Sequence, residues 1–482
     1  MAGLLSWRYG LFAQDDIRLT SRLTVNLGIR YDVMPYPREM HNRLSNFDPA
    51  SGTIRIAGQN ADERLVQTDF GDVAPRIGVA WSPGNAAKTV LRAGFGVSYT
   101  DPYGSAGILN SNEFNAPFYY VGNTTLFPFS APTVRLSGGP PPLASPSVTV
   151  PSGNQRYLVP DAGNPYSRTW SLELQRALSN HSLASVSYVG TSGNRLLMAS
   201  NINAAQPGAT APAGRRPYGS AVAEIRELSN TAESIYHGLE VRFERRFTHG
   251  FHMLGSWTWS KSLDDQSNGT DNVTGSGQYP QDPLHPALDR GLSSFDRSQG
   301  LVANAVWEIP FRRNAWRPLR AIAAGWQLSG ILTVRSGGPI NITDGFDYPG
   351  MGAAFVAPRP NVKAGRTVDN ITTGTLNQWF DPTAFALPPA GQLGHVGRDT
   401  LVGPHMRNVD FSLLKDTAVP RISEQFRVQF RAEFFNIFNH ANWGNPNNAV
   451  FVSGGGFNPV AGQITTLAVP MRQIQFALKV VF

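Results

Sequence analysis

The sequence predicts an all-β protein, an antiparallel transmembrane β-barrel with short turns at one end and long loops at the other. Three observations support this class. Apolar residues recur at every second position in one segment after another, the connections alternate between short and long, and the 482 residues include 48 Gly and 36 Pro. Period-two alternation is typical of strands, and Gly and Pro mark the turns between them. The chain contains no cysteine, which excludes disulfide scaffolds and thiolate metal sites.

The last residues of the chain show the alternation most clearly. One side of the predicted strand carries Ile474, Phe476, Leu478, Val480 and Phe482, and the other carries Gln473, Gln475, Ala477 and Lys479. Upstream, Phe426, Val428, Phe430, Ala432 and Phe434 alternate with Arg427, Gln429, Arg431 and Glu433. A helix would spread these polar side chains around its girth, whereas a strand places them all on one face.

The same pattern predicts about thirteen strands. They are 6–16, 23–32, 73–82, 88–100, 167–178, 182–190, 235–247, 251–262, 297–309, 325–336, 407–416, 426–434 and 471–482. Short connections are expected at 17–22, 83–87, 179–181, 248–250 and 417–423, and long ones at 33–72, 101–166, 191–234, 263–296, 337–406 and 438–470. Outer-membrane barrels have this form, with short periplasmic turns and long extracellular loops. The proline-rich stretch 128–160 is expected to be extended or irregular.

Aromatic residues lie near the ends of the predicted strands. They are Trp7, Tyr9, Tyr31, Trp81, Tyr99, Trp170, Tyr188, Trp257, Trp259, Trp307 and Trp326. Amphipathic rings are most stable at the headgroup level of a membrane, so this placement indicates two interfacial girdles. The alternative is the ordinary aromatic core of a soluble β-protein.

Charged and polar residues on two of the predicted strands are the candidate lumen-facing residues. They are Arg242, Glu244, Arg246, Arg427, Gln429, Arg431 and Glu433. An Arg facing lipid at the bilayer midplane costs roughly 2–4 kcal/mol, whereas a watery lumen tolerates it. These residues could form salt bridges along the barrel wall or contact the ligand directly, and the sequence does not decide between the two roles. Arg245 falls on the opposite face and is expected near the interface, where it can snorkel.

Other function classes find little support in the sequence. The nine His are dispersed and form neither a zinc motif nor a nucleophile elbow, so neither an enzyme nor a cofactor is expected. Asp264, Asp265, Asp271 and Asp282 fit no defined calcium loop and predict a solvated acidic loop rather than a metal site. The net charge of +7 comes from scattered Arg with only five Lys, so no nucleic-acid partner is expected. The first ten residues do not read as a signal peptide.

A series of short motifs resembles the barrel portion of TonB-dependent outer-membrane receptors, in particular the Oar-like group. The motifs are Tyr9-Gly-Leu-Phe-Ala-Gln-Asp-Asp16, Leu23-Thr-Val-Asn-Leu-Gly-Ile-Arg-Tyr-Asp32, Ala74-Pro-Arg-Ile-Gly78, Leu91-Arg-Ala-Gly-Phe-Gly96, Asn164-Pro-Tyr166, Tyr188-Val-Gly-Thr-Ser-Gly-Asn-Arg195, Tyr236-His-Gly-Leu239, Trp257-Thr-Trp-Ser-Lys-Ser-Leu-Asp-Asp265, Phe295-Asp-Arg297, Gly325-Trp-Gln-Leu-Ser-Gly330 and Phe434-Phe-Asn-Ile-Phe-Asn-His440. Each is weakly specific, and their order along nearly the whole chain makes the resemblance specific.

The resemblance implies that residues 1–482 are the C-terminal part of a barrel of about 22 strands, located in the outer membrane. It implies transport of an unidentified ligand, with energy supplied in the full-length parent by the TonB complex. Membrane lipid and the barrel-assembly machinery are further implied partners, the latter recognising Ile474, Phe476, Leu478, Val480 and Phe482. Signal peptide, plug and early strands of the family are not recognised, so a fragment is expected, unstable alone unless it closes into a smaller barrel.

Two alternatives remain at this stage. One is a soluble or cell-surface all-β binding protein, such as a carbohydrate-binding or adhesin-like module. The other is a passive porin without a plug, which would need one more strand because bacterial barrels have even strand numbers.

Overall fold

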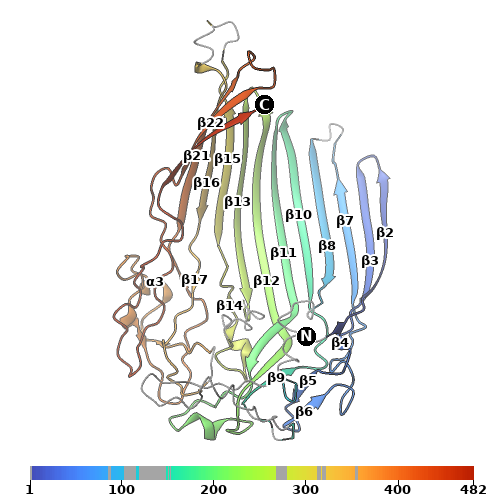
Figure 1. The fold of residues 1–482 in the computed structure, drawn as a ribbon, viewed down its shortest axis with the longest axis vertical. Coiled ribbons are helices and arrows are strands. Elements are labelled where there is room, and N and C mark those ends of the chain that lie inside the picture. Colours follow the sequence, from blue (N-terminus) through green and yellow to red (C-terminus); the bar gives the residue numbers. More distant parts are fainter. Residues whose placement is uncertain are drawn as a thin grey trace, which may run out of the picture.

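A single long antiparallel sheet organises the computed structural model, which describes residues 3–84, 88–101, 115–118, 148–149, 151, 153–267, 279–311, 316, 322–352 and 356–482. Thirteen strands pair in sequence order along this sheet as a tall curved wall (Figure 1). They are β2 (Tyr9–Thr20), β3 (Leu23–Val33), β7 (Val73–Trp81), β8 (Thr89–Tyr99), β10 (Tyr166–Ser179), β11 (Ser182–Asn201), β12 (Val222–Thr248), β13 (Phe251–Asp264), β15 (Gln299–Glu308), β16 (Trp326–Arg335), β21 (Met406–Ala418), β22 (Arg427–Phe435) and β23 (Gln473–Val481). All thirteen predicted strands are therefore confirmed.

The sheet is open along two edges. Its path begins at β2 and ends at β23, and these two strands do not pair with each other. Two further strands join the sheet beside this path, because β9 (Gly153–Leu158) runs parallel to β12, and β14 (Gly291–Leu292) pairs with the end of β13. The strand at 153–158 agrees with the prediction that 128–160 is extended or irregular; residues 128–147, 150 and 152 lie outside the described residues.

Turns and loops lie at opposite ends of the strands. Two-residue turns join β2 to β3, β10 to β11 and β12 to β13, and we call this the short-turn end. His249 and Gly250 both have positive φ, 51° and 77°, as a tight hairpin that follows the strand twist requires. The long connections gather at the other end, the long-loop end (Figure 1).

Two predicted connections were wrong in extent. The connection expected at 17–22 is a two-residue turn, because β2 continues to Thr20. Residues 191–234 were expected to form a long loop, but β11 continues to Asn201 and β12 begins at Val222. The pairing is irregular between Gly193 and Met198, which interrupts the period-two pattern. Beyond these irregularities Ala199 and Leu228, which pair directly, are buried in a core of the long-loop end, and Ser200 on the opposite face is buried as well, so neither face there is exposed to solvent.

The long loops are folded rather than loose. They contain β4 (Arg38–Glu39), β5 (Ser45–Asp48), β6 (Thr53–Ile56), β17 (Pro339–Ile340), β18 (Asn361–Val362), β19 (Phe385–Ala386), β20 (Leu401–Val402), the helix α3 (Val368–Ile371) and 3-10 helices at Pro212–Arg215, Pro286–Asp289 and Pro382–Ala384. The strand β1 (Leu4–Leu5), which precedes β2, pairs with β4. Four of the largest fully buried side chains, Tyr36, Phe47, Phe380 and Phe385, lie in these loops, whereas Ile225 and Leu228 lie at the long-loop end of β12. Among the described residues, no helix is long and apolar enough to span a membrane.

Candidate functional site

The seven predicted lumen residues lie on one face of the sheet. Directly paired residues of antiparallel strands point to the same side. Arg242 lies opposite Ser256, and the chain of pairs continues through Val302 and Thr333 to Asn408. Asp416 is eight residues beyond Asn408 on β21, so its side chain points to the same side of the sheet. Asp416 pairs with Gln429 of β22. Arg242 and Gln429 are therefore on the same side, which we call the polar face. That this face lines a lumen stays a prediction.

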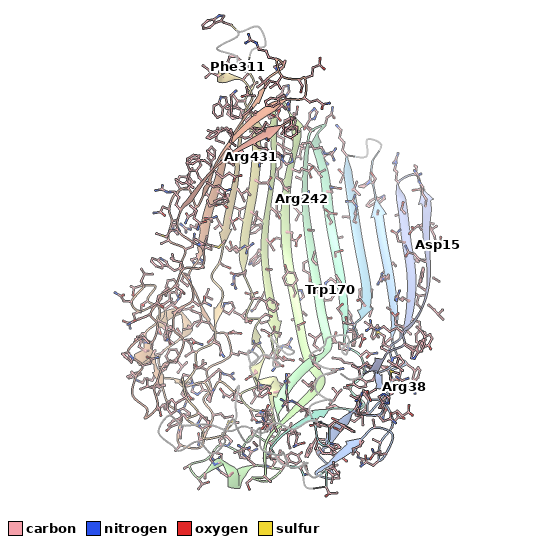
Figure 2. The ribbon with its side chains drawn as sticks, viewed as in Figure 1. Asp15, Arg38, Trp170, Arg242, Phe311 and Arg431 are labelled. Atoms are coloured by element: carbon pink, nitrogen blue, oxygen red, sulfur yellow. The ribbon has the colours of Figure 1, made fainter. Side chains whose placement is uncertain are left out.

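Ion pairs link neighbouring residues on the polar face. Arg242 contacts Glu244 at 3.0 Å, and Arg246 contacts the same carboxylate at 3.8 Å. Arg427 donates to Asp416 at 3.1 Å, and Gln429 donates to the same oxygen at 3.3 Å. Figure 2 labels Arg242 and Arg431 in the part of the sheet nearer the short-turn end. The pairs hold these side chains along the wall of the sheet.

The opposite face carries two belts of aromatic residues. Near the long-loop end it carries Tyr31, Tyr99, Trp170, Tyr188 and Trp259, and near the short-turn end Trp81, Trp307 and Trp326. Trp257 lies between the two belts. Trp307 pairs with Phe251, eight residues before Trp259 on β13. At about 3.4 Å per residue the belts are roughly 27 Å apart along the strand, close to the roughly 25 Å apolar band of outer-membrane barrels. We call this side the apolar face.

Arg245 lies on the apolar face, as predicted, close to the short-turn end. It pairs with Met253, and its guanidinium lies 5.9 Å from the centroid of the Phe251 ring. A cation over an aromatic ring near the end of a strand is the arrangement expected for a snorkelling Arg.

A buried charge network ties the long loops to the end of β13. Arg398 donates to Asp264 and, at 2.9 Å, to Asp399, and its side chain is only 8% exposed. Arg359 donates to Asp289 at 2.6 Å, and Arg290 donates to Asp265 at 2.9 Å. The network borders a cavity of about 250 Å³, which is also lined by Ser267, Tyr279 and Asn341.

The network contradicts one sequence prediction. Asp264 and Asp265 were expected in a solvated acidic loop, but both are buried and paired with arginines. Arg398 lies 134 residues beyond Asp264. Nothing in the local pattern around Arg359 or Arg398 marks them, because each is a single Arg in a glycine- and proline-rich loop. Asp282 pairs with His285 at 2.8 Å, and Asp271 lies outside the described residues.

Two carboxyl groups of the long loops have raised pKa values. Burial raises the pKa of Asp399 to about 6, although the neighbouring Arg398 favours the charged form. Burial raises the pKa of Asp344 to about 7. Neither carboxylate oxygen of Asp344 accepts a hydrogen bond within the described part of the chain. Asp344 therefore exchanges its proton near neutral pH.

No described group of three or more His, Asp or Glu side chains is arranged to hold a metal ion. The cavity instead brings together arginines and carboxylates that already satisfy one another. Its geometry is that of a structural clamp between loops.

The predicted assembly signal forms the edge strand β23. Ile474, Phe476, Leu478 and Val480 pair with Phe434, Ala432, Phe430 and Val428 on the apolar face. Phe482 follows the strand and is 92% exposed. Recognition of these residues by the assembly machinery stays a prediction.

Comparison with known proteins gives one matching family model and several similar solved structures. The family model described as "Outer membrane beta barrel domain" matches residues 1–475. No curated protein matches the chain. Similar solved structures include the outer membrane transporter YddB from Escherichia coli, at 12% identity and a TM-score of 0.49, covering 98% of this chain and 54% of that one.

Two further solved structures are similar at lower TM-scores. The copper transporter OprC has 11% identity and a TM-score of 0.44, covering 98% of this chain and 48% of that one. A FrpB iron transporter from Neisseria meningitidis has 10% identity and a TM-score of 0.44, covering 98% and 45%. This chain spans about half the length of the three structures.

Proposed function

Because this chain belongs to the family of outer membrane beta-barrel domains, we propose that it is the membrane-spanning part of a TonB-dependent transporter. Its location in the outer membrane follows from the family. The finer assignment, to the C-terminal part of an Oar-like receptor barrel over residues 1–482, is supported by the ordered motifs of the sequence. The role proposed is transport and not catalysis.

The observation that carries the proposal is the division of the sheet into two faces. One face carries ion-paired Arg, Glu and Asp over several strands, and the other carries the two aromatic belts. A charged wall is stable in a membrane only when it faces water or protein. The polar face would therefore line the path of the ligand.

The folded long loops support a role in ligand selection. They bury one apolar core around Phe380 and Phe385 and another around Tyr36 and Leu44. Loops held by their own cores can keep a binding surface in place above a lumen. The ligand that this surface selects is not identified by its geometry.

The open edges of the sheet support a larger barrel. Unpaired backbone groups in lipid cost several kcal/mol each, so β2 and β23 need partner strands. We propose that further strands close the barrel between them.

The test measures uptake by cells that carry or lack the gene, in the presence and absence of TonB. The probes are a panel of ⁵⁵Fe-labelled ferric siderophores, with a small sugar as the control for passive diffusion. We expect uptake of at least one siderophore to fall equally on loss of the gene or of TonB. Diffusion of the sugar through the chain, unchanged without TonB, would favour a passive porin. Recovery of the chain in the soluble fraction, without heat-modifiable migration, would favour a soluble binding protein.

A further inference from the structure

A groove of about 550 Å³ lies at the long-loop end of β13. Trp259, Lys261 and Leu263 alternate along β13 and point to the apolar face. β15 pairs with β13 only as far as Trp259, and β14 takes its place at Leu263. The groove is lined by this part of β13, by Leu292 of β14 and by Pro339 and Val402 of the loops.

The connection between β14 and β15 contributes Asp296 and Ser298 to the lining of this groove. Ser293 donates its backbone N–H to the carbonyl of Ser262, and Ser298 accepts from Ser260. The Asp296 side chain accepts from the backbone N–H of Ser262 at 2.7 Å and is only 7% exposed. The single acid of the groove is therefore tied to the backbone of β13.

The lining of the groove is apolar but exposed. Trp259 is 56% exposed, Val402 41% and Tyr188 39%. Tyr188 and Trp259 belong to the aromatic belt of the long-loop end, and such belts lie at headgroup level in a membrane. Apolar area of this kind gains about 25 cal/mol per Å² when a hydrocarbon chain covers it.

Two basic side chains stand at the groove. Lys261 is exposed and makes no hydrogen bond or ion pair within the described residues. His237 lies directly opposite Lys261 in the pairing of β12 with β13. The His237 Nδ1 atom lies 2.8 Å from the hydroxyl of Tyr188, which orients the ring. The groove thus combines an apolar trough with nitrogen donors at its polar rim.

We propose that this groove binds a phosphate-bearing lipid of the outer leaflet, with an acyl chain along Trp259 and Leu263 and the phosphate at Lys261 and His237. Long loops are extracellular in outer-membrane barrels, so the groove faces the outer leaflet. A cation on a flexible stem beside aromatic rings suits a lipid phosphate, and a free phosphate would leave the apolar trough uncovered. This inference rests on the membrane location and does not depend on transport.

The test compares retention of lipid A and of its dephosphorylated form by the full chain in detergent micelles, measured by native mass spectrometry. We expect the phosphorylated form to be retained preferentially, and Lys261→Gln to weaken its binding about tenfold, as for loss of one charge-assisted contact. Lys415→Gln is the matched control, because Lys415 lies beside Trp326 on the same face at the short-turn end. It should leave retention unchanged.

Heat-modifiable migration of each variant shows that it is folded. Equal retention of the two lipid forms would overturn the proposal, as would an equal loss with Lys415→Gln. Displacement of the lipid by millimolar inorganic phosphate would also overturn it, because the acyl chain would then contribute nothing.

Discussion

Arg359 donates a hydrogen bond of 2.6 Å to Asp289, and both side chains are buried, at 5% and 6% exposure. The pair joins two long loops that lie 70 residues apart. Arg359 also donates to the carbonyl of Val396, so its planar guanidinium spans three backbone segments. A charge pair of this kind holds loops in one arrangement.

Arg359→Met is expected to destabilise the loops by about 3–5 kcal/mol, because it leaves Asp289 charged and buried without its partner. Limited proteolysis in increasing urea measures this loss. Arg38→Ala is the control, since Arg38 and Glu63 form an exposed pair worth about 1 kcal/mol or less. The double variant Arg359→Met, Asp289→Leu should recover part of the loss, and a double variant no more stable than Arg359→Met would contradict this reasoning.

Asp344 should make the stability of the loops depend on pH. Its folded-state pKa of about 7 lies above the ordinary value of 3.8, so the folded state holds the proton more tightly than the unfolded state. The free energy of unfolding therefore falls as pH rises from about 4 to about 7 and stays low above that. Asp344→Asn should flatten this slope and stabilise the protein at pH 8 by up to about 4 kcal/mol. Thermal unfolding of the wild type and of Asp344→Asn at pH 5 and pH 8 measures this effect. The same pH dependence of stability in both proteins would show that Asp344 does not titrate in this range.

The two faces of β16 should respond differently to a charge. Leu332 lies on the apolar face, paired with Ala303 and Val409, and its neighbour Thr333 lies on the polar face. Leu332→Arg should cost roughly 2–4 kcal/mol in a bilayer, and Thr333→Arg much less. The free energy of folding of each variant is measured by folding it into lipid vesicles at a series of urea concentrations. The folded fraction at each concentration is read from heat-modifiable migration on a gel. Equal costs would mean that the assignment of the faces is wrong.

The orientation of the barrel is open to single-cysteine labelling, because the chain has no cysteine of its own. Ala390→Cys places a thiol in a long loop, and Asn180→Cys places one in the two-residue turn between β10 and β11. A membrane-impermeant maleimide added to intact cells should label position 390 and spare position 180. The reverse result would invert the proposed topology.

The terminal Phe482 should matter for assembly rather than for stability. Its side chain is 92% exposed, so Phe482→Ala should leave refolding into vesicles unchanged. If the assembly machinery recognises this end, the same variant should accumulate less folded barrel in the outer membrane of cells. Normal accumulation in cells would argue against the signal.

The sequence predicted the long strands well because apolar and polar residues alternate along each of them, one kind on each face of the sheet. The faces of β22 and β23 follow directly from the alternation at 426–434 and 471–482, and the structure keeps that register. Where the alternation stops, as between Gly193 and Asn201, the prediction failed. There residues of both faces, such as Ala199 and Ser200, are buried, so local periodicity carries no information.

The sequence by itself thus determined the sheet, its order of strands and its two faces, since strand periodicity is a local property of the chain. Only the tertiary structure decided the loop cores, the burial of Asp264 and Asp265, and the groove beside Lys261. These features depend on contacts between segments more than 100 residues apart, such as Arg398 with Asp264. Long loops with isolated Arg and Asp residues hold no local pattern that pairs them, because the packing of segments far apart in the sequence brings the partners together.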